Sequence, residues 1–500
     1  MKNILMFFIL IISINLFSQN FEDLNELSAK ETFQYLSNWN EFDQPVKTGI
    51  LVKDSIAVND TLIAPFAYYI PSNYKATERS PLFVYLHGGV GIPEFYPIED
   101  LSTDDEFAAF AEENNMLALF PSANMYCMWW DVIGAENILN QIKLMKRKFN
   151  VDDDRVFVSG ISDGGSGSFH LAMTRPDAFA SFYPIIGMLS VGNLENGMHS
   201  FPTNMKNRFV SAVNNNNDGL YPTKKMRKLM NIAQEAGADL FYKEIWGPGH
   251  EVPYLENHLK LMKSQMHKHP RDAFQPELFW EVAEPEFSKS DWLEITQIDT
   301  LQDVKEWHEI YNVKLTDNRM MFGFNHDQEY EGMGTKITNI VENSAAEDAG
   351  LQVADIIIGM DGKEAANIDS LVTWRDAKQR GDEFSLTVLR DGEEVVLKGR
   401  FPRPTEYDAF RFSKASGAVK ARYYGNIFEI ETSRVKEIAL YFHPEMINLE
   451  IPVIVNINGQ KVFHDTIDFD KDLMIQNYQK CFDRKALWIN KLTLNVPEEV

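Results

Sequence analysis

Ser162 lies in a pattern typical of a nucleophilic serine. The pentapeptide Gly160-Ile161-Ser162-Asp163-Gly164 follows the apolar run Val156-Phe157-Val158, which predicts a buried strand, and precedes a segment of helical character. A strand, a tight turn with serine at its apex and a helix form the context in which G-x-S-x-G exposes a serine Oγ. The amide of Asp163 is then expected to face the oxyanion that forms when Ser162 attacks a carbonyl.

A serine nucleophile needs a base and an acid that orients the base, and both have candidates further along the chain. Asp218 follows one predicted apolar strand, and His250 follows the next in a Gly/Pro-rich turn. None of the other histidines lies in such a loop after a strand-terminal aspartate. The sequence therefore predicts a series of Ser162, His250 and Asp218, with Asp239 as the nearest alternative for the acid.

A second apolar run, residues 82–86, leads directly into His87-Gly88-Gly89. Glycine lets the backbone approach a substrate carbonyl closely, so the amides of Gly88 and Gly89 are predicted to complete an oxyanion hole with that of Asp163. We interpret His87 as a residue that shapes this loop rather than as the catalytic base.

Residues 45–270 resemble secreted α/β-hydrolases of the esterase and polyhydroxybutyrate-depolymerase-like group, which overlaps the prolyl-oligopeptidase-type clan. Besides the serine pentapeptide, the resemblance rests on Trp129-Trp130-Asp131 before a helix and on the acid loop at 218–222. It implies a mostly parallel sheet with flanking helices. We expect Trp129 or Trp130 to form a wall of the substrate pocket, with at least one of them in the core. Asp163 departs from the family, which often has Met, Asn or Gln after the serine.

A second resemblance covers residues 319–402. The segment from Ile340 to Gly362 resembles the central signature of PDZ domains, with a small-residue helical turn followed by a strand rich in isoleucine. Phe322, Gly323 and Phe324 stand where such domains carry the loop that holds the C-terminal carboxylate of a peptide. The resemblance implies strand addition of a peptide beside Phe324. A module that only docks on its own hydrolase domain is the alternative.

The remaining segments complete a multidomain prediction. Residues 1–18 have a lysine and then an apolar run, which is typical of a signal peptide and implies export to the periplasm or the outside. Residues 19–44 are interpreted as a leader, residues 271–318 as a Trp-rich connecting segment, and residues 403–500 as a small all-β sandwich. No later segment approaches the roughly 20 apolar residues of a membrane-spanning helix.

Composition restricts the possible partners. The chain has 500 residues and a formal net charge of −25, which argues against nucleic acid because phosphate binding requires clustered Lys and Arg. Cys127 and Cys481 lie outside any metal or redox spacing, and the sequence leaves open whether they pair or remain free. No cofactor and no metal site are predicted.

These patterns predict an exported serine hydrolase that cleaves carboxylic esters through an acyl-enzyme. The substrate would be an ester-containing small molecule or polymer, such as a carbohydrate ester or a polyester. One alternative is a serine peptidase of the prolyl-oligopeptidase clan. Another is a PDZ-based binding scaffold around a degenerate hydrolase, which the intact Ser-Asp-His series argues against.

Overall fold

The computed structural model describes residues 23–42, 46–309, 313–317 and 320–498. The chain forms two compact units, of which the first comprises residues 1–311 and 410–500 and the second residues 312–409. The second unit is therefore inserted into the sequence of the first. The predicted signal peptide, residues 1–18, lies outside the described residues.

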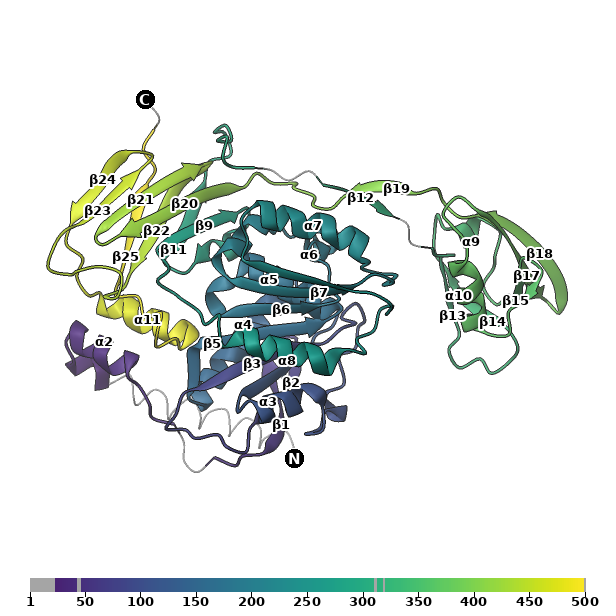
Figure 1. Ribbon diagram of the computed structural model, residues 1–500, viewed down its shortest axis with the longest axis horizontal. Coiled ribbons are helices and arrows are strands. Elements are labelled where there is room, and N and C mark those ends of the chain that lie inside the picture. Colours follow the sequence, from purple (N-terminus) through teal and green to yellow (C-terminus); the bar gives the residue numbers. More distant parts are fainter. Residues whose placement is uncertain (1–22, 43–45, 310–312, 318–319, 499–500) are drawn as a thin grey trace. The chain divides into compact units, whose positions relative to one another are not determined.

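An eight-stranded sheet forms the first part of the larger unit (Figure 1). The strand order is β1-β2-β4-β3-β5-β6-β7-β8, with antiparallel pairing at β1 and β2 and parallel pairing from β4 to β8. The strands are β1 Ile50–Ala57, β2 Ile63–Ile70, β3 Ser80–Leu86, β4 Leu117–Pro121, β5 Val151–Ile161, β6 Ser181–Ile185, β7 Phe209–Asn215 and β8 Leu240–Ile245. All residues of β4, β6 and β7 are buried, as expected for a parallel sheet that is covered on both faces.

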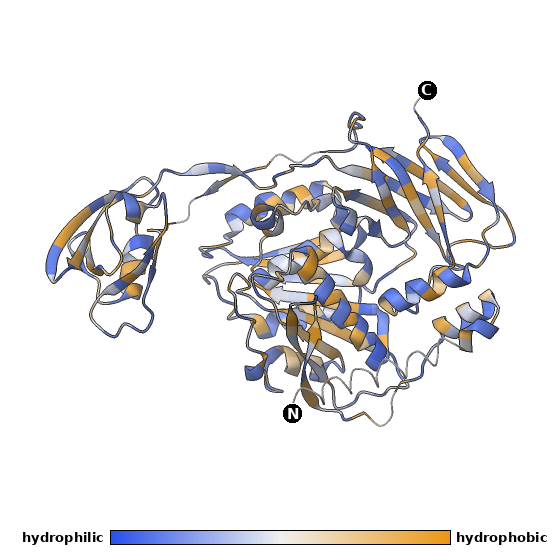
Figure 2. Cartoon of the chain, turned by 180° about the vertical axis from the view of Figure 1, so that it is seen from behind, coloured by the Kyte–Doolittle hydropathy of each residue, from blue (hydrophilic) through white to orange (hydrophobic). Residues whose placement is uncertain are grey.

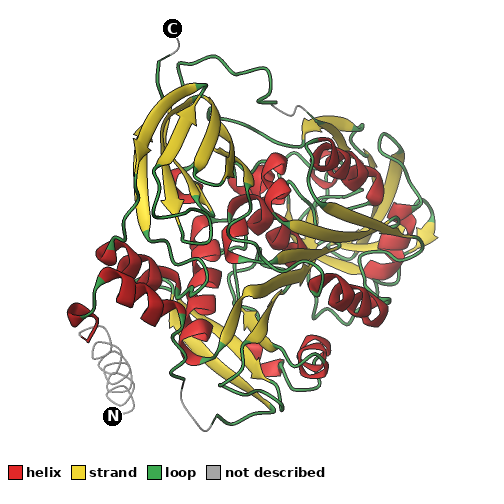
Figure 3. Ribbon diagram, turned by 60° about the vertical axis from the view of Figure 1, so that its left-hand side comes forward, coloured by secondary structure: helices red, strands yellow, loops and turns green. Residues whose placement is uncertain are grey.

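Helices lie on both sides of this sheet (Figure 3) and combine apolar with polar residues (Figure 2). They are α3 Glu106–Glu113, α4 Val132–Lys148, α5 Asp163–Thr174, α6 Val191–Asn196, α7 Thr223–Glu235 and α8 Leu255–Met266, with 3-10 turns at η2 Ile98–Asp100, η3 Pro176–Ala178 and η4 Pro202–Asn207. Phe107 of α3 and Met262 of α8 pack with Phe83 and Phe157 of the sheet in one apolar core. The predicted α/β-hydrolase fold is confirmed.

A β-sandwich forms the other part of the larger unit. One sheet has the order β10-β11-β22-β25 and the other β24-β23-β21-β20-β9. The elements are β9 Glu277–Val282, η5 Pro285–Phe287, β10 Lys289–Ser290, β11 Leu293–Ile298, β20 Gly417–Tyr424, β21 Ile427–Ser433, β22 Val435–Phe442, β23 Val453–Ile457, β24 Gln460–Asp465, α11 Lys471–Cys481 and β25 Asn490–Asn495. Asn458 and Gly459, both at positive φ, form the hairpin turn between β23 and β24.

The pairing within the sandwich corrects the predicted domain boundaries. Within the predicted connecting segment 271–318, residues 277–298 belong to the sandwich, because Leu278 of β9 lies opposite Ala421 of β20 and Leu293 of β11 lies opposite Leu440 of β22. The sandwich therefore begins near residue 277 and not at 403. Hydrogen bonds between strands far apart in sequence leave no local signal in composition, which is why the boundary was misplaced.

Part of the predicted leader is also structural. After the turn η1 Asp23–Glu26, helix α2 Ala29–Ser37 begins with a capping box between Ser28 and Glu31. It lies beside α11 (Figures 1 and 3), and Leu24 and Leu36 are buried in the sandwich core. Residues 23–37 therefore complete the sandwich.

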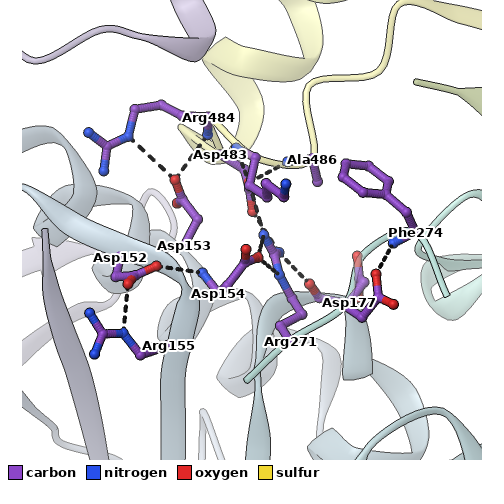
Figure 4. A network of polar contacts seen from close by, with 12 residues as sticks. Asp152, Asp153, Asp154, Arg155, Asp177, Arg271, Phe274, Asp483, Arg484 and Ala486 are labelled. Carbon is purple, nitrogen blue, oxygen red and sulfur yellow. Dashed lines mark hydrogen bonds and ion pairs between the residues drawn. The ribbon is translucent and has the colours of Figure 1, made fainter. Parts of the chain in front are cut away.

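Buried ions join the α/β part to the sandwich (Figure 4). Asp483, which follows α11, accepts from Arg271 at 2.7 and 3.0 Å and pairs with Lys146 at 3.3 Å. Arg271 also pairs with Asp154 of β5 at 3.3 Å, and Lys146 pairs with Asp153 at 2.8 Å. Burial alone would raise the pKa of Asp483, but Arg271 and Lys146 lower it well below the usual range. The network attaches the amino end of β5 to residue 483.

We expect Asp483→Ala to lower the free energy of unfolding by about 3–5 kcal/mol, because it leaves Lys146 and Arg271 buried without their shared partner. Urea-induced unfolding measures this loss, with Asp468→Ala at an exposed position as the control. Equal stability of the two variants would contradict a structural role of the network. For the same reason, a chain that ends at residue 270 is not expected to fold.

The inserted unit contains a six-stranded sheet with the path β13-β14-β15-β17-β18 and β16 beside β15. Its elements are β12 Lys314–Asp317, β13 Phe324–His326, β14 Thr335–Ile340, α9 Ala345–Asp348, β15 Ile356–Met360, β16 Lys363–Glu364, α10 Ile368–Asp376, β17 Glu383–Arg390, β18 Glu393–Arg400 and β19 Thr405–Asp408. Phe322, Phe384 and Phe401 pack together in its core. Strands β12 and β19 pair where the chain enters and leaves the unit, which extends it beyond the predicted limits of 319 and 402.

Two expectations from composition can be compared with the structure. Cys127 is buried and Cys481 is exposed, and both are free thiols, so the pairing that the sequence left open does not form. In the described part of the chain, no helix is long and apolar enough to cross a bilayer.

Four buried histidines make stability depend on pH. Burial lowers the pKa of His87 and His258 from 6.5 to about 4, and that of His170 and His443 to about 3. All four rings are therefore neutral in the folded chain near pH 7. The unfolded chain binds a proton at each ring once the pH falls below the ordinary value. Their contribution is complete well above pH 6.5. It is lost as pH falls toward 4 for His87 and His258 and toward 3 for His170 and His443, by up to about 1.4 kcal/mol per pH unit for each ring.

His170 provides the test, because neither of its ring nitrogens has a hydrogen-bond partner in the described structure. His170→Leu removes one titrating group without breaking a hydrogen bond. Between pH 6.5 and 5, the free energy of unfolding is expected to fall by about 1.6 kcal/mol less in this variant than in the wild type. Denaturant unfolding at both pH values measures the difference, and identical losses would contradict it.

Candidate active site

Ser162 occupies the sharp turn between β5 and α5. Its φ is 59° and its ψ is −117°, a conformation that is strained for any residue with a side chain. The neighbouring glycines leave room for this turn: a Cβ on Gly164 would lie 1.8 Å from the Leu86 carbonyl oxygen, and one on Gly160 would lie 2.4 Å from the Gly164 carbonyl. Ser162 is thereby held at the carboxyl end of β5, the same sheet edge at which the parallel strands β3, β6, β7 and β8 end.

The structure brings the three predicted residues into one hydrogen-bonded series. Ser162 Oγ lies 2.7 Å from His250 Nε2, and His250 Nδ1 lies 2.8 Å from Asp218 Oδ2. Asp218 is only 2% exposed, and its Oδ1 accepts from the amides of Leu220 at 2.8 Å and Tyr221 at 2.9 Å. A buried carboxylate that accepts from Nδ1–H leaves Nε2 free to accept the serine hydrogen. This arrangement can remove a proton from Ser162.

A run of asparagines, Asn214–Asn217, holds the loop that carries His250. Asn215 Nδ2 donates to the carbonyls of Gly249 at 2.8 Å and Glu251 at 2.7 Å, on either side of the histidine. Asn216 Oδ1 accepts from the Gly247 amide at 2.8 Å. Sequence reasoning gave these residues no role. The pattern that could have indicated this role is the run of four consecutive asparagines at a strand end, directly before the predicted acid Asp218.

The loop after β3 runs close past the serine. A Cβ on Gly88 would lie 3.1 Å from Ser162 Cβ, and Gly89 has a positive φ of 73°. His87 Nε2 accepts from the Ala123 amide at 3.0 Å, so Nδ1 is the donor to the Gly88 carbonyl at 2.8 Å. Since burial lowers the pKa of His87 to about 4, its ring is neutral near pH 7. His87 therefore shapes the glycine loop.

The Asp163 side chain makes a contact that the sequence did not indicate. Its Oδ2 accepts from the Val90 amide at 3.0 Å. This bond joins the first residue of α5 to the loop directly after Gly89. The two predicted sources of oxyanion-binding amides, the Gly88–Gly89 loop and Asp163 itself, are thus tied to each other.

Trp129 and Trp130 differ from the expectation that one of them forms a pocket wall. Their exposed fractions are 0% and 1%, so neither presents a surface to substrate. Trp129 Nε1 donates to the His87 carbonyl at 2.9 Å, and Trp129 Cβ would lie 2.4 Å from a Cβ on Gly167 of α5. Both indoles belong to the core, and the hydrogen bond of Trp129 to the His87 carbonyl holds the start of the glycine loop in place.

Exposed apolar side chains lie on loops at the same edge of the sheet. Tyr126 follows β4, Leu220 follows β7 and Trp246 follows β8, with exposed fractions of 58%, 50% and 74%. Strand β4 lies on one side of β5, and β7 and β8 lie on the other. Their loops therefore lie on either side of the strand that carries Ser162, and they offer exposed apolar surface at this edge of the sheet.

Residues 312–398 match the family model described as PDZ domain, which confirms the predicted PDZ-like domain. Phe322 is buried there, Gly323 has a positive φ of 88°, and Phe324 begins the edge strand β13. The peptide-binding role of these three residues stays a prediction.

Parts of the chain are similar to known proteins. A bifunctional acetylxylan esterase/xylanase from Neocallimastix patriciarum is 27% identical over 122 residues, which cover 24% of this chain and 17% of that protein. The serine protease Do-like HtrA of Bacillus subtilis is 37% identical over 75 residues, which cover 15% and 16%. The structure of Thermogutta terrifontis esterase 2 phosphoramylated by tabun has a TM-score of 0.37 at 14% identity, over 45% of this chain and 97% of that chain. This chain thus spans less than a fifth of the length of either curated relative.

The hydrogen bond from the Val90 amide to Asp163 can be tested by labelling Ser162 with a fluorophosphonate. The phosphoryl oxygen of this probe is expected to bind the same amides, those of the Gly88–Gly89 loop and of Asp163, as the carbonyl oxygen of a substrate. Asp163→Ala removes the acceptor and is expected to lower the second-order labelling rate about tenfold, the effect of one lost charge-assisted hydrogen bond. Asp163→Asn keeps an oxygen that can accept and should stay within about threefold of the wild type. If Asp163→Ala reacts as fast as the wild type, the carboxylate does not position the loop.

Proposed function

We propose that this protein is an exported serine hydrolase that cleaves carboxylic esters. The observation that carries the proposal is the hydrogen-bonded series from Ser162 through His250 to the buried Asp218. The similarity to an acetylxylan esterase supports an ester as the substrate. Export rests on the apolar run within residues 1–18.

In the proposed reaction, Ser162 Oγ attacks the ester carbonyl while His250 Nε2 takes its proton. Asp218 holds the imidazole through Nδ1–H and stabilises the imidazolium that forms. Amides of the Gly88–Gly89 loop and of Asp163 donate to the oxyanion. His250 then returns the proton to the departing alcohol. Water, deprotonated by His250, then attacks the acyl-enzyme; the bond to Ser162 Oγ breaks, His250 returns the proton to Oγ, and the acid is released.

We further propose that the substrate is an acetyl ester on a polysaccharide. The name of the Neocallimastix relative supports this class of ester. Tyr126 and Trp246, exposed on loops after strands that lie on opposite sides of β5, can pack against the apolar faces of sugar rings beyond the reacting unit. A polymer would contact both, whereas a small ester would need neither.

The PDZ domain supports a second role, the binding of a peptide C-terminus. Peptides add to PDZ domains as an extra strand, and β13 lies at the edge of its sheet. Such binding would recruit the hydrolase to a partner protein.

Ser162→Ala is expected to abolish release of acetate from acetylated xylan and from p-nitrophenyl acetate, because it removes the attacking oxygen. The melting temperature should stay within about 2 °C of the wild type, since only one partly buried hydroxyl is lost. A wild-type protein that reacts with neither ester nor fluorophosphonate would be a binding scaffold. Turnover of peptides but not of esters would identify a peptidase.

Asp218→Asn is expected to lower kcat by about four orders of magnitude, because an amide at this position favours the wrong imidazole tautomer. The matched control is Asp239→Asn. Asp239 was the alternative acid in the sequence, and its Oδ2 lies 4.0 Å from His269. The control should keep wild-type kcat on p-nitrophenyl acetate. A reversed result would assign the acid to Asp239.

A further inference from the structure

The imidazole of His250 is carried by a loop that gives it little support. Its side chain is 27% exposed, and a Cβ on either nearby glycine, Gly247 or Gly249, would meet no atom within 4 Å. Asp218 holds only Nδ1, and the bond between Nε2 and Ser162 is the one that the reaction breaks. The plane of the ring therefore depends on contacts other than its hydrogen bonds.

Tyr221 lies against this imidazole. The two ring centroids are 5.8 Å apart and the ring planes meet at 72°, an edge-to-face arrangement that aromatic pairs prefer. The amide of Tyr221 donates to Asp218 Oδ1 at 2.9 Å. The next residue, Pro222, favours an extended backbone at Tyr221. The phenol ring is thus placed beside the base by the same loop that carries the acid.

The hydroxyl of Tyr221 is bound on the side of the nucleophile. It is hydrogen-bonded to Ser166 of α5. Ser166 Oγ also donates to the Ser162 carbonyl at 3.3 Å and accepts from the Met188 amide at 3.0 Å. Because a serine hydroxyl has one hydrogen and two acceptor positions, Tyr221 is the donor in its bond to Ser166. Both ends of the Tyr221 side chain are therefore fixed.

The surroundings of Tyr221 keep its hydroxyl protonated. Burial raises the pKa of Tyr221 well above its usual range, and the carboxylates of Asp163, Glu195 and Asp218 raise it further. The hydroxyl therefore remains a donor throughout the pH range in which an imidazole titrates. Its bond to Ser166 persists while the base gains and loses its proton.

We propose that Tyr221 is a positioning residue that holds the imidazole of His250 in the plane that directs Nε2 to Ser162 Oγ. This inference rests on the proposed function. Tyr221 reaches the base through its ring, the acid through its amide and, by way of Ser166, the backbone of the nucleophile. Its effect is exerted through His250 and not through a contact with the substrate.

The test compares Tyr221→Phe with Tyr221→Ala in the full chain. Tyr221→Phe keeps the ring and loses one hydrogen bond, so kcat for p-nitrophenyl acetate should stay within about threefold of the wild type. Tyr221→Ala should lower kcat about thirtyfold, because the aromatic contact is lost and the imidazole gains freedom to tilt. KM should change by less than about twofold in both variants. Tyr221→Leu, which keeps apolar volume without an aromatic plane, is the second variant in case Tyr221→Ala does not fold.

Labelling with a fluorophosphonate separates positioning from substrate contact. The second-order labelling rate of Tyr221→Ala should fall by about the same factor as kcat, because the probe requires the same base. Tyr424→Ala, at an exposed position of β20, is the control and should change neither rate. If Tyr221→Ala is labelled as fast as the wild type but hydrolyses esters slowly, Tyr221 is a substrate contact and the proposal is wrong.

A signal from His250 itself makes the test independent of hydrolysis. The Nδ1 proton held by Asp218 should give a far-downfield proton NMR resonance in the wild type and in Tyr221→Phe, and its loss in Asp218→Asn assigns it. In Tyr221→Ala, this resonance should broaden through exchange with water, because a tilting ring loosens the bond to Asp218. An equally sharp resonance in Tyr221→Ala would overturn the positioning role. A wild type that shows the resonance but reacts with neither ester nor fluorophosphonate would contradict the hydrolase function alone.

Discussion

The backbone conformation of Ser162 is the constraint on which the candidate site depends. A residue with a side chain is held at a φ of 59° because backbone packs directly against backbone around it. Gly160 and Gly164 leave no room for a Cβ beside Leu86, and Gly165 would bring one within 2.5 Å of the Ile185 carbonyl. The turn is therefore stable only where β3, β5 and β6 already lie side by side.

The opposite end of the same strand is fixed by charge. Asp153 and Asp154, at the amino end of β5, bind Lys146 and Arg271, which in turn share Asp483 beyond α11. Buried charges of this kind contribute little net stability as a group, but loss of any one leaves the others unpaired. The sandwich is thus not an accessory module, because it supplies a charge that the strand carrying Ser162 requires.

The PDZ domain stands in a different relation to the rest of the chain. It occupies the connection between β11 and β20, so both ends of the insertion meet the same sandwich. The segment that follows the inserted unit is hydrogen-bonded to the α/β part within its first four residues. Asn193 of α6 binds both the amide and the carbonyl of Arg411, and His199 accepts from the Ser413 amide at 2.9 Å. The segments that precede and follow the insertion in sequence are therefore both packed within the larger unit.

The sequence by itself determined the features that rest on local pattern and chain order. The turn at Ser162, the positions of Asp218 and His250 after successive strands, and the PDZ signature follow from spacing over a few residues, because strands, turns and glycine requirements are local. Tertiary structure alone decided the rest. The burial of Trp129 and Trp130, the bond from Asp163 to Val90 and the pairing of β9 with β20 join residues far apart in sequence. Only the folded chain brings such groups within the few ångströms over which hydrogen bonds and packing act.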